Sequence, residues 1–264
     1  MHKVLSDNLS NNDKNLTTYL NLHSYRLARK NKEVFKNFNI LIDGIIFVWI
    51  LKLFGFVKVK RNSFDMTSMA PKVFDKAINK KQSIYFVGAK PNVIDDSVSN
   101  IRAEFLGLNI YGFRHGYFGS KEEYKVVIEE IKELKVNIVV CGMGTPLQEQ
   151  FLIDLKNCGW DGKGYTCGGF LHQTANKIQY YPYLIDKYNL RGFYRMYDEP
   201  KLIKRYLISY PIALFLYVFD SLQYNLNKTL GKVDEEEIVE KEEEEKIKVT
   251  VEPTEKQMKE LEEV

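Results

Sequence analysis

At 264 residues the chain is long enough for one large domain or two small ones, and its 45% hydrophobic content is ample for a buried core. The formal net charge of +3 hides an asymmetry, because residues 1–232 carry a net charge of +12 and residues 233–264 a net charge of −9. The three cysteines, Cys141, Cys158 and Cys167, form no metal-type pair and are odd in number, which argues against an oxidising compartment and favours a reducing cytoplasm.

The two ends of the chain carry no clear targeting or membrane-spanning signal. The N-terminal sequence "MHKVLSDNLSNNDKN" is too polar for a secretion signal, and we expect residues 1–15 to be flexible. The longest uncharged apolar stretch, residues 206–219, is short for a membrane span and contains a proline. We therefore expect a cytoplasmic protein.

The N-terminal third alternates strand and helix patterns in an irregular way. After residues 39–44, "NILIDG", an apolar stretch continues to residue 57, and a helix is expected to begin near Ser63 or Asp65. The predicted elements before that point are a strand at 16–23, a helix at 24–36 and a strand at 39–44.

The middle of the chain is more regular, with apolar runs ending in glycine and each followed by a helix signal. Ser120 with Glu123, and Thr145 with Gln148, have the spacing of capping boxes, and Pro146 suits a first helical position. Strands are predicted at 83–88, 108–113, 136–142 and 164–169, with helices from Pro91 to about Phe105 and from Ser120 to about Leu134. This alternation predicts an α/β domain over residues 16–190, with a parallel sheet covered by helices.

The C-terminal part changes character. Residues 191–230 are aromatic and basic, and we interpret them as a helical appendage that contacts a membrane surface; packing as a core helix or an oligomer contact is the alternative. Residues 231–264 form an acidic tail, read as disordered or as a marginal helix.

Candidate ligand-binding residues follow the predicted strands, because ligands of open parallel sheets bind beyond the carboxyl ends of the strands. These residues are Asn21, Asp43, Gly44, Gly88, Ala89, Lys90, His115, Gly116, Tyr117, Gly142 to Glu149, Gly168 and Gly169.

The loop "GMGTPLQE" has two interpretations. Gly142 and Gly144, placed between a strand and a helix, suit a diphosphate held by backbone amides, but a plain tight turn uses the same residues. Gln148 and Glu149 are either ligands of the substrate or ordinary residues of the first helical turn. Asp43, at the end of an apolar strand and before Gly44, is a candidate general base, and a helix cap is its alternative role.

The histidines have no metal-ligand spacing, and Asp95-Asp96 is not an Asp-x-Asp pair, so neither a metal nor a cofactor is expected. A Gly-x-Gly-x-x-Gly loop near the first strand is not evident, which ranks a dinucleotide oxidoreductase last.

Several ordered motifs together resemble the WecG/TagA/CpsF glycosyltransferases of bacterial envelope polysaccharide synthesis. The resemblance runs from about Leu16 to Leu207, through "YFVGAKPNV", "FRHGYFGSKEEYKVVIEEI", "NIVVCGMGTPLQEQF" and "RGFYRMYDEPKLIKRYL". It implies a Rossmann-like fold and transfer of a sugar, of the N-acetylhexosamine type or its uronate, with inversion. The implied donor is a UDP-sugar, and the implied acceptor is linked to a polyprenyl diphosphate in the membrane.

The same resemblance implies roles for individual residues. Asp43 matches the family's proposed base, Arg61 an active-site arginine before Asp65, and Asn21 an asparagine at the end of the first strand. Arg195 and Arg205 match arginines that reach the diphosphate. The implied location is the inner face of the cell membrane, with no nucleic-acid partner and, as a further partner, a second copy of the chain in a homo-oligomer.

The chain departs from the family pattern at Ile42, Tyr19, His172 and Tyr180, where the family has Pro, Thr, Asp and Arg. These departures keep a second hypothesis open, namely a non-catalytic or divergent nucleotide-sugar-binding protein of the same fold.

Overall fold

The computed structural model describes residues 1–10, 13–56, 58–188 and 190–230. The chain divides into two compact units, Met1–Tyr217 and Val218–Val264, and everything said below about the site concerns the first unit.

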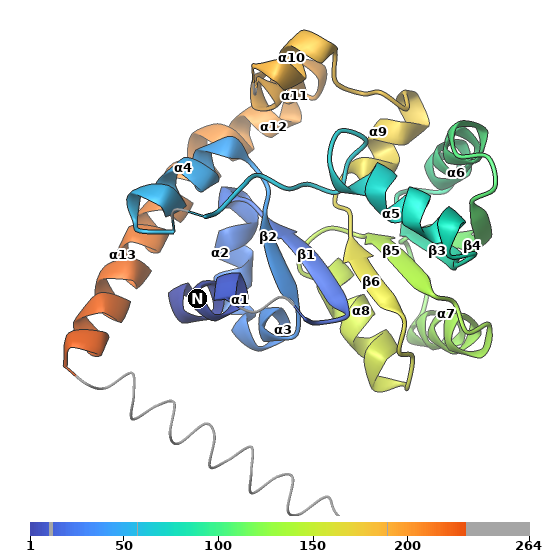
Figure 1. The fold of residues 1–264 in the computed structure, drawn as a ribbon, viewed down its shortest axis with the longest axis horizontal. Coiled ribbons are helices and arrows are strands. Elements are labelled where there is room, and N and C mark those ends of the chain that lie inside the picture. The colour runs from blue at the N-terminus through green and yellow to red at the C-terminus, as the bar shows by residue number, and fades with distance from the viewer. Residues whose placement is uncertain (11–12, 57, 189, 231–264) are drawn as a thin grey trace, which may run out of the picture. The chain divides into compact units, whose positions relative to one another are not determined.

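One six-stranded sheet forms the centre of the first unit (Figure 1). All strand pairs are parallel, in the order β2-β1-β6-β5-β3-β4. The strands are β1 Leu16–Leu20, β2 Asn39–Ile42, β3 Ser83–Gly88, β4 Asn109–Arg114, β5 Ile138–Gly142 and β6 Lys163–Thr166. The predicted α/β fold with a parallel sheet is therefore confirmed.

Helices cover both faces of the sheet, because its strands carry apolar side chains on both faces. Along β3, Tyr85 and Val87 belong to one apolar core and Ile84 and Phe86 to another, because successive side chains of a strand point to opposite faces. A strand that is buried on both faces has a nearly continuous apolar sequence, as "SIYFVG" has in β3. The largest side chains of the two cores include Phe35 and Phe151 on one face and Phe74 and Phe170 on the other.

The helices of the described chain are mostly short; α1 precedes the first strand, α2 to α8 lie between strands, and the rest follow β6. They are α1 His2–Ser10, α2 Leu22–Lys30, α3 Lys32–Lys36, α4 Ile45–Leu53, α5 Met69–Asn79, α6 Val93–Glu104, α7 Lys121–Glu133, α8 Leu147–Asn157, α9 Phe170–Asn176, α10 Tyr183–Lys187, α11 Arg191–Asp198, α12 Lys201–Lys204, the π-helical turn η1 Arg205–Ser209 and α13 Tyr210–Thr229.

The N-terminus differs from the flexible stretch expected there. Residues 2–10 form α1, and Met1, Val4 and Leu5 are buried in the core. The spacing of Val4, Leu5 and Asn8 puts them on one face, where Asn8 Oδ1 accepts a hydrogen bond from the amide of Ile40 at 3.2 Å.

Two helix starts differ from the sequence-based expectation, and the predicted start at Ser120 is confirmed. The helix expected at Ser63 or Asp65 begins at Met69, because Asp65 and Ser63 form hydrogen bonds in the preceding turn. Ser120 caps α7 by accepting from the Glu123 amide. Thr145 does not cap α8, since its hydroxyl donates to Glu149 instead, and the helix begins at Leu147.

The appendage predicted at residues 191–230 consists of α11, α12, η1 and α13, and Ala213 and Tyr217 of its last helix are buried in the core. Residues 202–229, a continuous helical stretch made of parts of α12, η1 and α13, are long and apolar enough to cross a membrane by length and composition alone, whereas the uncharged apolar stretch 206–219 is shorter. The acidic tail, residues 231–264, lies outside the described residues.

Candidate active site

Asp43 lies where the strands β1 and β2 end. Its amide donates to the Leu20 carbonyl at 2.8 Å, which fixes the residue at the carboxyl edge of the sheet. Gly44 follows with φ of +93°, a backbone conformation that favours glycine, and lets α4 begin at Ile45. Asp43 therefore lies between the sheet and the start of a helix, without an observed capping bond of its own.

Arg61 is brought to Asp43 by a short extension of the sheet. Ile42 and Arg61 form an isolated parallel bridge, and the Asn62 amide donates to the Ile42 carbonyl at 2.8 Å. The Arg61 guanidinium lies 4.0 Å from the Asp65 carboxylate and donates to Ser63 Oγ at 3.3 Å. Arg61 and the carboxylates of Asp43 and Asp65 therefore influence one another electrostatically where β2 ends.

Asp65 is the most heavily bonded group of the site. Its carboxylate accepts hydrogen bonds from the Ser63 hydroxyl at 2.6 Å and from the amide and hydroxyl of Thr67 at 2.9 and 2.7 Å. Arg191, from α11, adds a buried ion pair at 2.7 Å. Asp65 therefore connects the loop before α5 to the C-terminal helices.

Two further arginines approach from the C-terminal helices. Arg195 lies one turn after Arg191 and donates to Glu199 at 3.1 Å. Its Nε atom is buried and has no hydrogen-bond partner among the residues that the structure describes. Gly169 makes room for it, since a Cβ there would lie 3.3 Å from the guanidinium. Arg205, in η1, lies close enough for its charge to interact with Asp43.

The charged groups around Asp43 shift its pKa in opposite directions. Burial raises the pKa of the Asp43 carboxyl, and the neighbouring Asp65 raises that pKa further. Arg61, Arg195 and Arg191 lower it, but the net change is upward. A carboxylate with a raised pKa is a stronger proton acceptor than an ordinary surface aspartate, which suits a general base.

The glycines at the strand ends divide into two kinds. Gly88 and Gly142 allow two strands to approach closely, because a Cβ on Gly88 would lie 2.5 Å from the Gly142 carbonyl oxygen. Gly144 and Gly168 both have positive φ, and a Cβ on either would meet no atom of the described chain within 4 Å. Of the two pairs, Gly144 and Gly168 border open space that a ligand could occupy.

Gln148 and Glu149 are buried rather than facing that space. Glu149, 0% exposed, accepts through Oε1 from Thr18 at 2.7 Å, Gln148 at 3.0 Å and Thr145 at 3.2 Å. The Gln148 side chain accepts from the Gly168 amide at 3.2 Å. Burial raises the pKa of Glu149, against the effect of its hydrogen bonds. The pair thus joins β1, the loop before α8 and the loop after β6.

The remaining predicted site residues lie apart or are engaged locally. The Asn21 side chain caps α2 by accepting from the Ser24 amide at 3.0 Å. His115 accepts from the Tyr117 amide at 3.3 Å, and both follow β4, whereas Asp43 follows β2 at the opposite edge of the sheet. Five strand spacings, roughly 24 Å, separate these two strands. The loop after β4 instead lies beside the loop after β5, since a Cβ on Gly116 would be 2.9 Å from the Met143 side chain.

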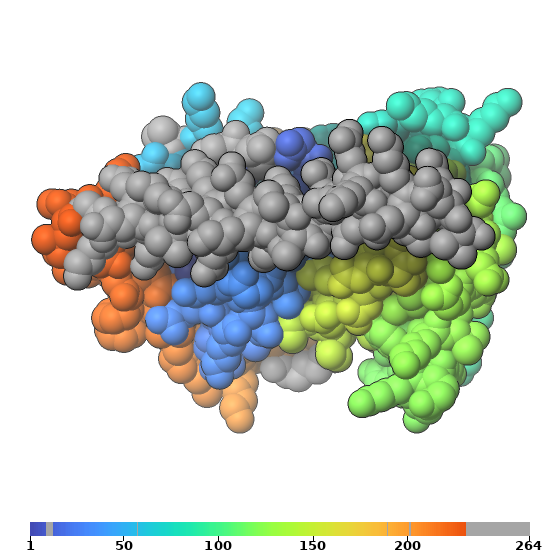
Figure 2. Space-filling model, turned by 90° about the horizontal axis from the view of Figure 1, so that it is seen from below, coloured from blue at the N-terminus to red at the C-terminus, as the bar shows by residue number. Residues whose placement is uncertain are grey.

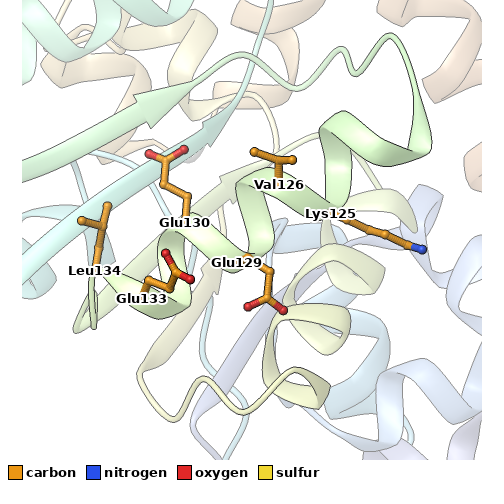
Figure 3. A pocket seen from close by; sticks show the side chains of 6 residues that line it. All are labelled: Lys125, Val126, Glu129, Glu130, Glu133 and Leu134. Carbon is orange, nitrogen blue, oxygen red and sulfur yellow. The ribbon is translucent and has the colours of Figure 1, made fainter.

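Two hollows in the described part of the chain differ in size and in the charge of their lining. A groove along α7 is lined by Lys125, Val126, Glu129, Glu130, Glu133 and Leu134 (Figure 3). Its three carboxylates make it a poor site for an anionic nucleotide. A small cavity beside Asp65 and Thr67, bordered by Tyr180 and Tyr181, has a volume of about 10 Å³, which is room for about one water molecule and not for a nucleotide. Across the four described stretches of chain, no group of three or more His, Cys, Asp or Glu residues is placed to hold a metal.

Residues 1–227 match the glycosyl transferase WecG/TagA/CpsF family. The chain belongs to this family. A similar protein is the Shigella boydii UDP-Gal:alpha-D-GlcNAc-diphosphoundecaprenol beta-1,4-galactosyltransferase, 37% identical over 210 residues, which cover 78% of this chain and 87% of that protein. Another is the Bacillus spizizenii N-acetylglucosaminyldiphosphoundecaprenol N-acetyl-beta-D-mannosaminyltransferase, 26% identical over 168 residues, or 64% of this chain and 63% of that protein.

The residues predicted from the sequence for the site of this WecG/TagA/CpsF glycosyltransferase did not include Arg191. The residue makes the ion pair with Asp65, and its guanidinium lies 4.9 Å from the centre of the Tyr181 ring. The signal was present in "RGFYR", because arginines four positions apart share one helix face.

Proposed function

We propose that this glycosyltransferase moves a sugar from a UDP-sugar to a sugar carried by a polyprenyl diphosphate. The observation that carries the proposal is the position of Asp43, a carboxyl with a raised pKa, within the electrostatic influence of Asp65 and of Arg61 and Arg191. These two arginines come from distant parts of the chain, and both lie within 4.0 Å of the Asp65 carboxylate. The names of the two relatives, both transferases that act on lipid-diphosphate-linked N-acetylglucosamine, support it.

In the proposed reaction Asp43 takes the proton from the acceptor hydroxyl. The hydroxyl oxygen bonds to the anomeric carbon as the bond from that carbon to the UDP oxygen breaks, which inverts the anomeric configuration. Negative charge grows on the departing diphosphate, where positive groups stabilise the transition state most. Arg61 and Arg195 are the proposed groups, and the unpartnered Nε of Arg195 is a donor available for a phosphate oxygen.

The proposed nucleotide site is the open space beside Gly144 and Gly168. Neither residue has a side chain that would block a diphosphate, and the Gly144 amide is the proposed backbone donor. Gln148 and Glu149 are proposed to act indirectly, by holding these two loops together through the Gly168 amide and Thr145.

The enzyme is further proposed to work at the inner face of the cell membrane. Helices α11, α12 and η1 combine the exposed Lys204 with exposed apolar side chains, including Phe193 and Leu207, and such a surface suits an anionic bilayer. High salt is expected to release the protein from anionic liposomes in a flotation assay, and a protein that stays in solution at low salt would contradict this location.

The decisive experiment measures UDP release from the purified full chain. UDP-galactose and UDP-N-acetylhexosamines are offered as donors with N-acetylglucosaminyl-diphosphoprenol as acceptor, and the prenyl diphosphate without sugar serves as control. Acceptor-dependent UDP release, absent in Asp43→Asn, is expected. Tight UDP binding without turnover of any donor would instead favour a nucleotide-sugar-binding protein.

A further inference from the structure

Helix α4, residues Ile45–Leu53, exposes an apolar stripe. Ile46, Trp49 and Leu53 are 46%, 60% and 84% exposed, and their spacing of three and four residues puts them on one face of the helix. The other face is packed in the core through Phe47, Val48 and Leu51. In Figure 2 the side chains coloured as this part of the chain, pale blue, stand out from the surface at the upper left.

Basic residues follow the stripe, and acidic ones are absent from it. Between Asp43 and Asp65 the sequence contains four basic residues, Lys52, Lys58, Lys60 and Arg61, and no acidic residue. Lys52, Lys58 and Lys60 are exposed. An exposed apolar face with a cationic border complements the headgroups and the hydrocarbon edge of an anionic bilayer.

The helix also holds a fixed position relative to the catalytic site. It begins two residues after Asp43, so the stripe runs away from the proposed base. Phe47 and Phe54 contact the ring of Tyr217 with centroid separations of 5.6 and 5.3 Å, which ties α4 to the first turns of α13. A nine-residue helix is about 14 Å long, too short to span a bilayer, and can only lie in its surface.

We propose that α4 is a membrane-inserted element of this enzyme, with Ile46, Trp49 and Leu53 buried in the headgroup region of an anionic bilayer. The inference rests on the proposed function, because a lipid-linked acceptor presents its reacting sugar at the bilayer surface. Insertion of α4 holds Asp43 at that surface. The amphipathic indole of Trp49 suits the boundary between headgroups and acyl chains.

The chain contains its own probe for this contact. Of its two tryptophans, Trp160 is buried and donates to the Val136 carbonyl at 2.6 Å, so a change in emission on vesicle addition reports on Trp49. Vesicles of phosphatidylglycerol and phosphatidylcholine without any prenyl lipid are added to the full chain. A blue shift of emission, and quenching by lipids brominated near the headgroup, are expected, and both are lost in Trp49→Phe.

Matched variants separate insertion of α4 from binding by the C-terminal helices. Ile46→Ser with Leu53→Ser keeps Trp49 and is expected to reduce brominated-lipid quenching about tenfold. Leu106→Ser, at a residue 82% exposed beyond the end of α6, is expected to leave quenching unchanged. Unquenched Trp49 in the parent protein while the protein floats with the vesicles would overturn the proposal, as would a blue shift that follows protein concentration without vesicles.

The quenching readout needs no sugar donor or acceptor, so its failure is distinct from a failure of the proposed function. Where insertion is observed, the same double variant is expected to lose activity on acceptor in vesicles and to keep activity on a short-chain acceptor in detergent. Equal loss on both acceptors would show that α4 shapes the site itself and would overturn a membrane role for the stripe.

Discussion

Arg191 is expected to hold the C-terminal helices over the end of the sheet where Asp43 and Asp65 lie. It is a residue of α11, yet its side chain forms an ion pair with Asp65 and a hydrogen bond with Thr67, both in the loop before α5. Both side chains of the pair are nearly buried, at 12% and 11% exposure. We therefore expect Arg191→Met to release the arginine segment, defined as residues 183–209, from the sheet.

The expected loss of free energy depends on the hydrogen bonds and the positive charge that remain around Asp65 in Arg191→Met. Removing one partner of a buried ion pair costs about 3–5 kcal/mol when the other charge is left without compensation. Asp65 keeps its bonds from Ser63 and Thr67 and lies 4.0 Å from Arg61, so its charge stays compensated and we expect a smaller cost of about 2 kcal/mol. That corresponds to an increase of about 30-fold in the population of the released state.

Hydrogen exchange followed by mass spectrometry measures this population, since amides that exchange through local opening report its free energy. Amides of residues 191–209 are expected to exchange about 30-fold faster in Arg191→Met, whereas those of α7 remain unchanged. Asp186→Asn is the matched control, because Asp186 bonds to Arg191 from the same segment and its loss leaves the Asp65 pair intact. Exchange within threefold of the parent in Arg191→Met would refute the reasoning.

Four further predictions concern the chemistry. Asp43→Asn is expected to lower turnover by roughly 10²–10⁴-fold with UDP affinity retained, measured by UDP release and calorimetry, and turnover within threefold would remove Asp43 from the mechanism. A base must be deprotonated, so activity is expected to fall as the pH drops below the raised pKa of Asp43. The Asp65 charge raises this pKa, so Asp65→Asn is expected to move the acid limb of the pH–rate profile to lower pH. A shift of that limb to higher pH would contradict the assignment. Gly144→Val is expected to weaken UDP binding about tenfold. The control Gly159→Val changes a residue with a similar positive φ at the far end of α8, and it is expected to leave UDP binding unchanged. Equal effects of the two variants would mean that Gly144 serves only the turn. UDP is expected to bind equally well with and without a chelator, because the arginines supply positive charge, and calorimetry in which chelator abolishes binding would refute this.

The sequence alone was sufficient for the sheet and for the main catalytic candidate. Strands such as 83–88 are continuous apolar runs that end in glycine, and burial on both faces leaves no other pattern for a central parallel strand. Asp43 was recognisable because a carboxylate directly after such a run must lie at the carboxyl edge of the sheet, where α/β proteins bind ligands.

Local patterns were less reliable where tertiary contacts compete for the same groups. The spacing of Thr145 and Gln148 predicted a capping box, but the Thr145 hydroxyl donates to the buried Glu149. That carboxylate needs donors once it is removed from water, and it also takes the hydroxyl of Thr18, 131 residues away in sequence. The predicted flexible N-terminus likewise has a helix at residues 2–10, because Leu5 finds a place in the core.

Only the tertiary structure decided which of the strand-end residues share a site. The strand order puts β2 and β4 at opposite edges, which separates His115 and Tyr117 from Asp43 although all three follow strands. Conversely, Asp65 and Arg191 are 126 residues apart and meet in a buried ion pair. Hydrophobic periodicity specifies which residues face the core within one element, whereas the order of strands and the partners of buried charges depend on contacts between distant elements, which no local pattern encodes.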